Sequence, residues 1–253
     1  MSRFFITLAY NGKNYVGWQI QPNGESVQEV LQNALSIILR GEIVLVGAGR
    51  TDAGVHARKM IAHFDWNGIA FDPNDLVFKL NGFLPRDIAV YAIREVDTRA
   101  HARFSASSRT YKYFITLRKD PFLFDLKYRI FYTPDIEKMN CCAQILKEYA
   151  DFTSFSKLHT DVKTNFCNIT DAYWERVGEY DLVFTITADR FLRNMVRAIV
   201  GTLLEVGRGR LDENDFRRII EAKDRRSAGT SAPGYGLYLH DIVYPEWVFQ
   251  IGD

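Results

Sequence analysis

The chain has 253 residues, of which 47% are hydrophobic and 25% charged, and its 32 basic and 31 acidic residues give a formal net charge of +1. This composition is typical of one large or two small globular domains, and it excludes a disordered tail protein, a collagen-like repeat and a disulfide miniprotein. No window approaches the ~20 consecutive apolar residues of a membrane span. The first residues are predicted to form a strand and not a signal peptide. The three cysteines form no C-x-x-C pair, so we expect reduced thiols in a cytoplasm.

Apolar periodicity and turn residues predict a mixture of strands and helices in chain order. A first helix opens at the capping box Ser26-Val27-Gln28-Glu29 and ends near Gly41. The other elements predicted in the first half are strands over 3–10, 43–46, 59–66, 88–96 and 109–117, and a helix over 74–84. In the second half, helices are predicted over 136–149, 191–206 and 212–222, and strands over 169–177, 180–188 and 237–243.

Short turns join several of the predicted strands, and helices occur in both halves. This pattern predicts an α+β protein with a largely antiparallel mixed sheet flanked by helices, built from two related halves. The composition turns basic near residues 99–109. We therefore predict an N-terminal half over 1–104 and a C-terminal half over 105–253.

Basic residues are concentrated in two stretches although the net charge is close to zero. Residues 98–119 contain six basic side chains and no acidic one, interleaved with aromatic residues: Arg99, Arg103, Arg109, Lys112, Arg118 and Lys119. Residues 190–210 contain five arginines and a single acid, Glu205. A near-neutral protein with two basic stretches indicates a defined anion-binding site and not a generally basic surface.

The glycine-rich turn GAGRTDAGVHA, residues 47–57, presents one carboxylate, Asp52. Its glycines allow a ligand to approach the backbone closely. A phosphate loop is excluded because no Gly-Lys-Ser/Thr follows, and a dinucleotide fingerprint is excluded because Asp52 occupies the position of its third glycine. Asp52 is therefore a candidate catalytic carboxylate. The alternative is a turn aspartate that hydrogen-bonds its own backbone.

Arg109, Tyr111 and Tyr113 alternate along a predicted strand and therefore share one face. On that face Tyr111 is placed to stack on a base, with Arg109 or Arg103 at a phosphate. The alternative is a half-buried edge strand with solvated charges.

Arg193 and Arg197 are four residues apart and fall on one face of the helix predicted over 191–206. An arginine beside so apolar a stretch is costly unless it meets an anion. The alternative is an arginine that snorkels to the surface, which suits Arg193 better than Arg197.

The sequence offers no pattern for a metal site or a serine nucleophile. Neither H-E-x-x-H nor G-x-S-x-G occurs, and no second acid stands out opposite Asp52 for glycosidase chemistry. The histidines are scattered: His56, His63, His101, His159 and His240.

Short motifs follow one another through essentially the whole chain: 10–12 (YNG), 15–19 (YVGWQ), 26–29 (SVQE), 48–56 (AGRTDAGVH), 81–88 (NGFLPRDI), 101–106 (HARFSA), 109–113 (RTYKY), 151–155 (DFTSF), 191–197 (FLRNMVR) and 232–239 (APGYGLYL). In this order they resemble the tRNA pseudouridine synthase A family. The resemblance implies the pseudouridine synthase fold, with two halves that meet at a central cleft. It also implies isomerisation of uridine to pseudouridine at positions 38, 39 and 40 of the tRNA anticodon stem-loop.

The same resemblance implies roles for individual residues. Asp52 matches the catalytic aspartate, Arg50 the arginine that enters the helix when the base flips, Tyr111 the tyrosine that packs on the target base, and Arg197 the arginine that pairs with the aspartate. Further RNA contacts are expected at His101, Arg103, Phe104, Arg109, Lys112, Lys119, Lys163 and Arg193. The loop 156–168 departs from the family pattern, which has an arginine shortly before the isoleucine-like position. The nearest polar candidates in this sequence are Lys163 and Asn168.

The resemblance implies no cofactor and no metal, tRNA as the partner, and a cytoplasmic homodimer without a membrane association. Two other functions stay open: a non-catalytic RNA-binding protein, and a cofactor-free nucleoside hydrolase or glycosidase. Asp52, Tyr111 and Arg197 together favour catalysis over binding alone. The lack of a second catalytic acid or metal cluster disfavours hydrolysis.

Overall fold

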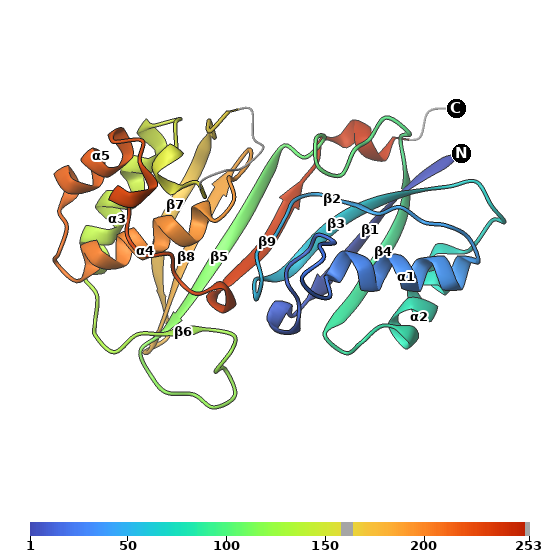
Figure 1. Cartoon of the computed structure of the whole chain (residues 1–253), viewed down its shortest axis with the longest axis horizontal. Helices are drawn as coiled ribbons and strands as arrows, with labels where there is room; N and C mark the ends of the chain where they lie inside the picture. Colours follow the sequence, from blue (N-terminus) through green and yellow to red (C-terminus); the bar gives the residue numbers. More distant parts are fainter. Residues whose placement is uncertain (158–163, 251–253) are drawn as a thin grey trace. The chain divides into compact units, whose positions relative to one another are not determined.

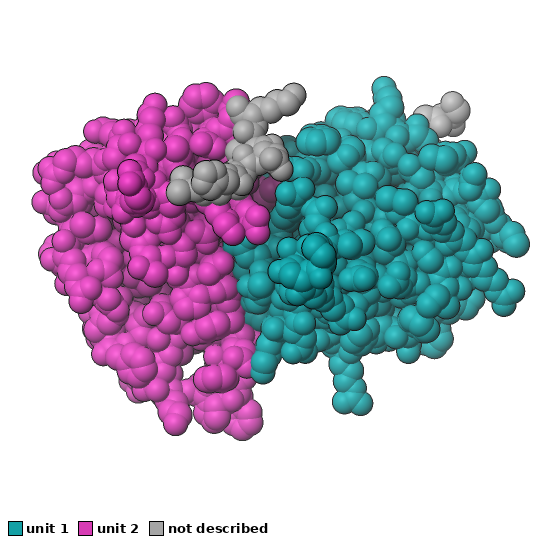
Figure 2. All heavy atoms as spheres, in the orientation of Figure 1, with its two compact units in different colours: residues 1–108, 239–253 teal, residues 109–238 magenta. Residues whose placement is uncertain are grey.

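A computed structural model of the chain describes residues 1–157 and 164–250. Two compact units can be distinguished (Figure 2). Unit 1 contains residues 1–108 and the described residues from 239 onward, and unit 2 contains the described residues of 109–238. No helix in the described part of the chain combines the length and apolar character that crossing a membrane requires.

Unit 1 is built on an antiparallel sheet in which β1 lies between β4 and β3, while the short β2 pairs with β3 (Figure 1). Its strands are β1 (Ser2–Tyr10), β2 (Val46–Gly47), β3 (His56–Trp66) and β4 (Ile88–Val96), and β9 (Leu237–Val243) enters this unit from unit 2. The β1–β3 register places Arg3 opposite Asp65, and the Arg3 Nε to Asp65 Oδ1 distance is 2.7 Å. The register is therefore supported by a cross-strand ion pair.

In the described part of unit 1, the α-helices α1 and α2 each begin at a capping side chain. Ser26 Oγ accepts a hydrogen bond from Glu29 N (3.2 Å) at the start of α1 (Val27–Leu39), which confirms the predicted helix start. Asp72 caps α2 (Pro73–Phe83) by accepting from two backbone amides. The helix α2 packs on β4 and against α1 (Figure 1).

Unit 2 contains an antiparallel sheet in the order β5–β8–β7, with a short β6 that runs parallel to β5. The strands are β5 (Ser108–Thr116), β6 (Tyr128–Arg129), β7 (Ile169–Val177) and β8 (Asp181–Ala188), and the helices are α3 (Ile136–Ile145), α4 (Met195–Gly207) and α5 (Glu213–Glu221). The helix α3 packs on β7, and α4 and α5 pack on α3 (Figure 1). The predicted α+β class with a largely antiparallel sheet is confirmed.

The strand predicted over 43–46 is wrong, because β2 consists of Val46–Gly47 only. Side chains of α1 bond the backbone groups that a longer strand would use. Gln28 Nε2 donates to Leu45 O (2.7 Å), and Gln32 Oε1 accepts from Leu45 N (3.0 Å). A backbone group that is already paired to a side chain does not need a strand partner.

The helix predicted over 191–206 begins later, at Met195. Asn194 precedes it in the left-handed conformation (φ 66°), which asparagine tolerates better than most residues. Its Nδ2 donates to Ser231 Oγ (2.7 Å). Arg193 therefore lies before the helix, and the prediction that Arg193 and Arg197 share a helix face is wrong.

Candidate active site

Asp52 lies in the loop between β2 and β3 of unit 1, and its side chain is half-buried. The segment 10–18, which begins at the last residue of β1, holds this loop through hydrogen bonds. Trp18 N donates to Thr51 O (3.3 Å), and the Tyr10 and Thr51 hydroxyls lie 2.9 Å apart. Trp18 and Tyr10, which make these contacts, are deeply buried, so the peptide that precedes Asp52 is held from two sides.

Two glycines bring the segment 10–18 into direct backbone contact with the Asp52 loop. A Cβ atom at Gly12 would lie 2.0 Å from Val55 O. Gly17 adopts a φ of +115°, and a Cβ atom there would lie 2.3 Å from Thr51 O. Only glycine fits such a close approach and such a backbone conformation. The two motifs that contain these glycines, 10–12 and 15–19, therefore support the loop.

The turn at Asp52 is closed through the backbone. Val55 N donates to Asp52 O (3.2 Å), and Gly54, with a φ of +75°, lies between them. His56, the first residue of β3, accepts from Gly12 N at its Nδ1 (3.0 Å) and is buried. The backbone of the Asp52 turn is therefore fixed both by its own closing bond and by the segment 10–18.

A second turn of unit 1 contains His101, Arg103 and Phe104. His101 Nδ1 accepts hydrogen bonds from Arg103 N (3.1 Å) and Phe104 N (3.3 Å). The His101 and Phe104 rings lie 4.4 Å apart, while 76% of Phe104 is exposed. Phe104 thus projects an aromatic face into solvent from a fixed position, the arrangement by which proteins stack on unpaired bases.

Two neutral imidazoles support this turn. Burial, followed by the charge of Arg3, lowers the pKa of His63 to about 4. The same two causes lower the pKa of His101. His63 Nδ1 accepts from Ala102 N (3.1 Å), and a ring nitrogen accepts only when it carries no proton. The turn therefore depends on deprotonated histidines.

In unit 2, Arg109, Tyr111 and Tyr113 lie on the buried face of β5, as their alternation predicts, and Lys112 lies on the other face. Tyr111 meets the Phe191 ring edge-on, with 5.1 Å between ring centroids. Arg109 is also buried, and its Nη1 donates to a backbone carbonyl of unit 2 (2.7 Å). The structure thus brings Tyr111 and Arg109 to one face and leaves Lys112 on the opposite one.

Tyr113 is completely buried in the core of unit 2. Its hydroxyl donates to Pro233 O (2.9 Å), and a Cβ atom at Gly236 would lie 2.7 Å from its ring. Burial raises the pKa of Tyr113 far above its usual range. A hydroxyl in that state supports structure and does not transfer protons near neutral pH.

Arg197 is half-buried on the first turns of α4, and its backbone and side chain both bond to the segment 228–233. Its Nε donates to Ala232 O (2.7 Å), and Ala232 N donates to Arg197 O (2.9 Å). The segment lies against the helix backbone, because a Cβ atom at Gly201 would lie 1.8 Å from Thr230 O. The Ala232 carbonyl therefore orients the Arg197 side chain, and the position of that carbonyl depends on the segment 228–233.

Ser231 is the centre of a polar cluster that fixes the segment 228–233. Its Oγ accepts from Asn194 Nδ2 (2.7 Å) and from Arg225 Nη2 (2.8 Å). Arg225 Nη1 also donates to Gly229 O (3.1 Å). The sequence analysis did not identify Asn194, Arg225 or Ser231. The only signal for them was their place in and near the motifs 191–197 and 232–239.

Comparison with known proteins gives one consistent result. Residues 6–105 and 145–245 match the family model described as tRNA pseudouridine synthase. Three relatives are each called tRNA pseudouridine synthase A. That of Parabacteroides distasonis is 60% identical over 253 residues, which is 100% of both chains. That of Bacteroides fragilis is 58% identical over 250 residues, 99% of each chain, and that of Bacillus subtilis 37% identical over 246 residues, 96% of this chain and 99% of the relative.

The chain belongs to the tRNA pseudouridine synthase family. Enzymes of this family are isomerases that convert uridine in tRNA to pseudouridine. The resemblance to this family is thereby confirmed, and the two matched segments together contain most of the motifs that carry it.

The remaining predicted contact residues are dispersed. Arg50 and Arg103 are exposed and line one cavity of unit 1, together with Gly49 of the Asp52 loop. Arg193 and Lys119 are exposed in unit 2. Lys163 lies outside the described residues.

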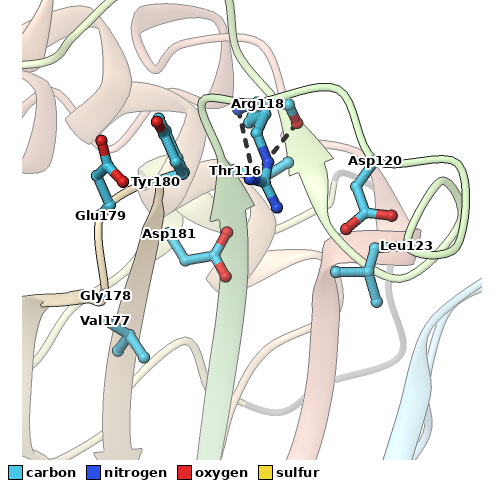
Figure 3. Close-up of a pocket in the computed structure, with 9 residues that line it drawn as sticks. All are labelled: Thr116, Arg118, Asp120, Leu123, Val177, Gly178, Glu179, Tyr180 and Asp181. Carbon is cyan, nitrogen blue, oxygen red and sulfur yellow. Dashed lines mark hydrogen bonds between the residues drawn. The ribbon is translucent and has the colours of Figure 1, made fainter.

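A cavity of about 190 Å³ in unit 2 contains none of the predicted site residues (Figure 3). It lies where the β7–β8 hairpin turns, and its lining includes Arg118 and the carboxylates of Asp120, Glu179 and Asp181. Three acids against one arginine disfavour a polyanion such as RNA. Among the described residues, no group of three or more His, Cys, Asp or Glu side chains is arranged to hold a metal ion.

Proposed function

We propose that this chain isomerises uridine to pseudouridine at positions 38, 39 and 40 in the anticodon stem-loop of tRNA, with Asp52 as the nucleophile. Membership of the family supports the reaction. The observation that carries the residue assignment is the Asp52 loop, because backbone contacts with the segment 10–18 hold a half-buried carboxylate in one position. Such fixed placement is what nucleophilic catalysis requires.

The reaction rearranges bonds within one nucleotide. The N1–C1′ glycosidic bond breaks, the detached uracil turns, and a C5–C1′ bond forms. The C5 hydrogen leaves as a proton, N1 gains a proton, and no oxidant or cofactor is consumed. A carboxylate either forms a covalent intermediate or stabilises the oxocarbenium-like species, and the surrounding walls retain the free base.

Other residues are assigned to the substrate. Tyr111 packs on the target base, and Arg197 pairs with Asp52. Arg50 fills the space that the extruded base leaves, since the enzyme must take the base out of its stack. In this assignment the predicted half 1–104 supplies Asp52, and the predicted half 105–253 supplies Tyr111 and Arg197.

RNA contacts are proposed at residues that present a positive charge or an aromatic ring: His101, Arg103, Phe104, Arg109, Lys112, Lys119, Lys163 and Arg193. The near-zero net charge means that one chain offers no large basic surface. We therefore propose that the chain forms a homodimer in the cytoplasm and that the tRNA-binding surface extends across both copies. Light scattering of the active enzyme tests this: a fully active particle of one 29.2 kDa chain contradicts the dimer.

Tritium release from C5-labelled uridine in unmodified tRNA tests the reaction with the purified protein alone. We expect release at positions 38, 39 and 40, together with pseudouridine in the digested product. Release of free uracil would instead identify a hydrolase. Tight tRNA binding without tritium release would identify a binding protein. Activity lost in EDTA and restored by zinc would contradict the metal-free mechanism.

A further inference from the structure

A cavity of about 170 Å³ in unit 1 lies beside the Asp52 loop. Its lining comes from segments that are distant in sequence: Trp18, Gln19, Gln28, Leu45, Val46, Gly47, Gly49, Arg50 and Arg103. A single water needs only about 10–15 Å³ of such space. The cavity therefore accommodates a group much larger than one water or a bare ion.

The floor of the cavity is held in place before any ligand binds. Gln28 uses both ends of its amide, donating to Leu45 O (2.7 Å) and accepting from Ile20 N (3.1 Å). Trp18 and Leu45 are buried, and a Cβ atom at Gly47 would lie 2.3 Å from Trp18 Nε1. A preformed site of this kind avoids the entropy cost of ordering loops when a ligand binds.

The outer part of the cavity is positively charged. Arg50 and Arg103 are both exposed, and Gln19 adds an exposed amide. Among the described residues that line the cavity, none is acidic. Guanidinium groups bind phosphate oxygens in pairs of parallel hydrogen bonds. The lining also includes the apolar side chains of Trp18, Leu45 and Val46, against which the carbon face of a sugar can pack. The chemistry of the cavity therefore fits a ribose–phosphate unit.

The position of the cavity relates it to the target nucleotide. Arg50 precedes Asp52 by two residues, and two residues of chain span at most roughly 7 Å. A ligand held beside Arg50 is thus close to the nucleotide that Asp52 attacks. We propose that this cavity binds the ribose–phosphate of an RNA nucleotide adjacent to the target uridine, with Arg103 and Gln19 as its polar contacts. This inference rests on the proposed function, because it takes Asp52 to be at the reacting nucleotide.

Anticodon stem-loops that each contain one uncharged methylphosphonate linkage test the proposal. Dissociation constants are measured for the wild type, Arg103→Ala, Gln19→Ala and the control Arg86→Ala, which removes an exposed arginine of unit 1 outside the cavity. For the wild type, one linkage next to the target uridine is expected to weaken binding about tenfold, the size of one hydrogen-bonded charge contact. With Arg103→Ala the same substitution is expected to cost less than about twofold, because the contact is already lost.

Arg86→Ala should keep the full tenfold effect, and Arg103→Lys should keep part of it. The proposal is overturned if no linkage couples to Arg103 or Gln19, or if the coupled linkage is remote from the target. A site for free anions is indicated instead if inorganic phosphate alone binds as tightly as the stem-loop, and that result also overturns the proposal. Tritium release from the unmodified stem-loop is measured in parallel. If tritium is released but no linkage couples to Arg103 or Gln19, only the assignment of the cavity is refuted. If a linkage couples but no tritium is released, only the proposed reaction is refuted.

Discussion

The two units hold their candidate site residues by different physical means. In unit 1 the Asp52 loop rests on backbone contacts that glycines permit: Gly12 lies against Val55 O and Gly17 against Thr51 O. In unit 2 Arg197 is oriented by the segment 228–233, whose place depends on side-chain hydrogen bonds centred on Ser231. The first arrangement depends on shape, and the second on polar partners.

This difference predicts which substitutions each unit tolerates. A backbone contact has no room for an added atom, so even one methyl group moves the Asp52 loop. A side-chain network tolerates changes of size better than the loss of a partner, because each unpaired donor then has to be solvated. Substitutions in each unit test this contrast, and the largest effect is expected at Asp52, the residue that the unit 1 loop presents.

Asp52→Asn removes the nucleophile that the unit 1 contacts position. We expect pseudouridine formation to fall by at least roughly 10⁴-fold, or about 5 kcal/mol of barrier. Binding of tRNA should be largely kept, since phosphate contacts dominate affinity. Tritium release and a filter-binding assay measure the two quantities.

Glu42→Gln is the matched control for Asp52→Asn, because it neutralises an exposed carboxylate of unit 1. It should leave both quantities unchanged. Near-normal turnover of Asp52→Asn would refute its role as the nucleophile.

Gly12→Ala tests whether unit 1 depends on shape. The new Cβ atom would lie 2.0 Å from Val55 O, so the loop must shift. Overpacking of this kind costs about 1–3 kcal/mol of stability. The melting temperature and kcat should both fall, because the displaced loop carries Asp52.

Gly49→Ala is the matched control, since no atom lies within 4 Å of a Cβ at that position of the same loop. Its stability should change by less than about 0.5 kcal/mol. Equal effects of the two alanines on stability would show that the close backbone contact is unimportant.

Ser231→Ala tests the polar arrangement of unit 2. It removes the acceptor of Asn194 Nδ2 and Arg225 Nη2, at a cost of roughly 1–2 kcal/mol because these groups are only partly buried. We expect kcat to fall more than tRNA affinity, since the Ala232 carbonyl that orients Arg197 loses its support. Thermal unfolding and single-turnover rates measure both effects.

Ser231→Thr keeps the hydroxyl and should restore most of the lost rate. Ser227→Ala, which removes an exposed hydroxyl near the same segment, should have no effect. A Ser231→Ala enzyme with a wild-type single-turnover rate would show that the Ser231 cluster does not contribute to catalysis.

Sequence reasoning identified the fold class and most elements because apolar periodicity and capping residues are local signals. The Ser26 cap is an example, since its bond to Glu29 N lies within one helical turn. The strand over 43–46 was wrong because Gln28 and Gln32, distant in sequence, bond the backbone there. Local propensity does not reveal such long-range partners.

The candidate site was predictable to the extent that residue type reveals chemistry. Asp52 was predictable because it is a carboxylate between glycines, and the order of the motifs indicated the family. The Ser231 cluster was not predictable, because serine, asparagine and arginine on separate segments have no common spacing. Arg193 was misplaced because nothing in the sequence showed that Asn194 takes a left-handed conformation.

The smallest expected effect is the pH dependence of stability, and it also differs between the two units. The pKa of His63 is about 4 in the folded protein, below the ordinary value near 6.5. The unfolded chain therefore binds more protons than the folded one between these values, so stability falls as pH decreases from about 6.5 towards 4. The unit 2 cluster contributes no such slope, because arginine guanidinium does not titrate in proteins.

His63→Asn tests this difference, because the Asn Oδ1 replaces the acceptor that His63 Nδ1 offers to Ala102 N and does not titrate. Melting temperatures are compared between pH 6.5 and 5, a window above the ordinary range of most carboxyl groups. The wild type should lose stability over this window, and the variant should lose less, whatever its stability at pH 7. Ser231→Thr serves as the control from unit 2 and should follow the wild-type slope. Parallel curves for His63→Asn and the wild type would show that the turn with Arg103 and Phe104 does not depend on a neutral imidazole at position 63.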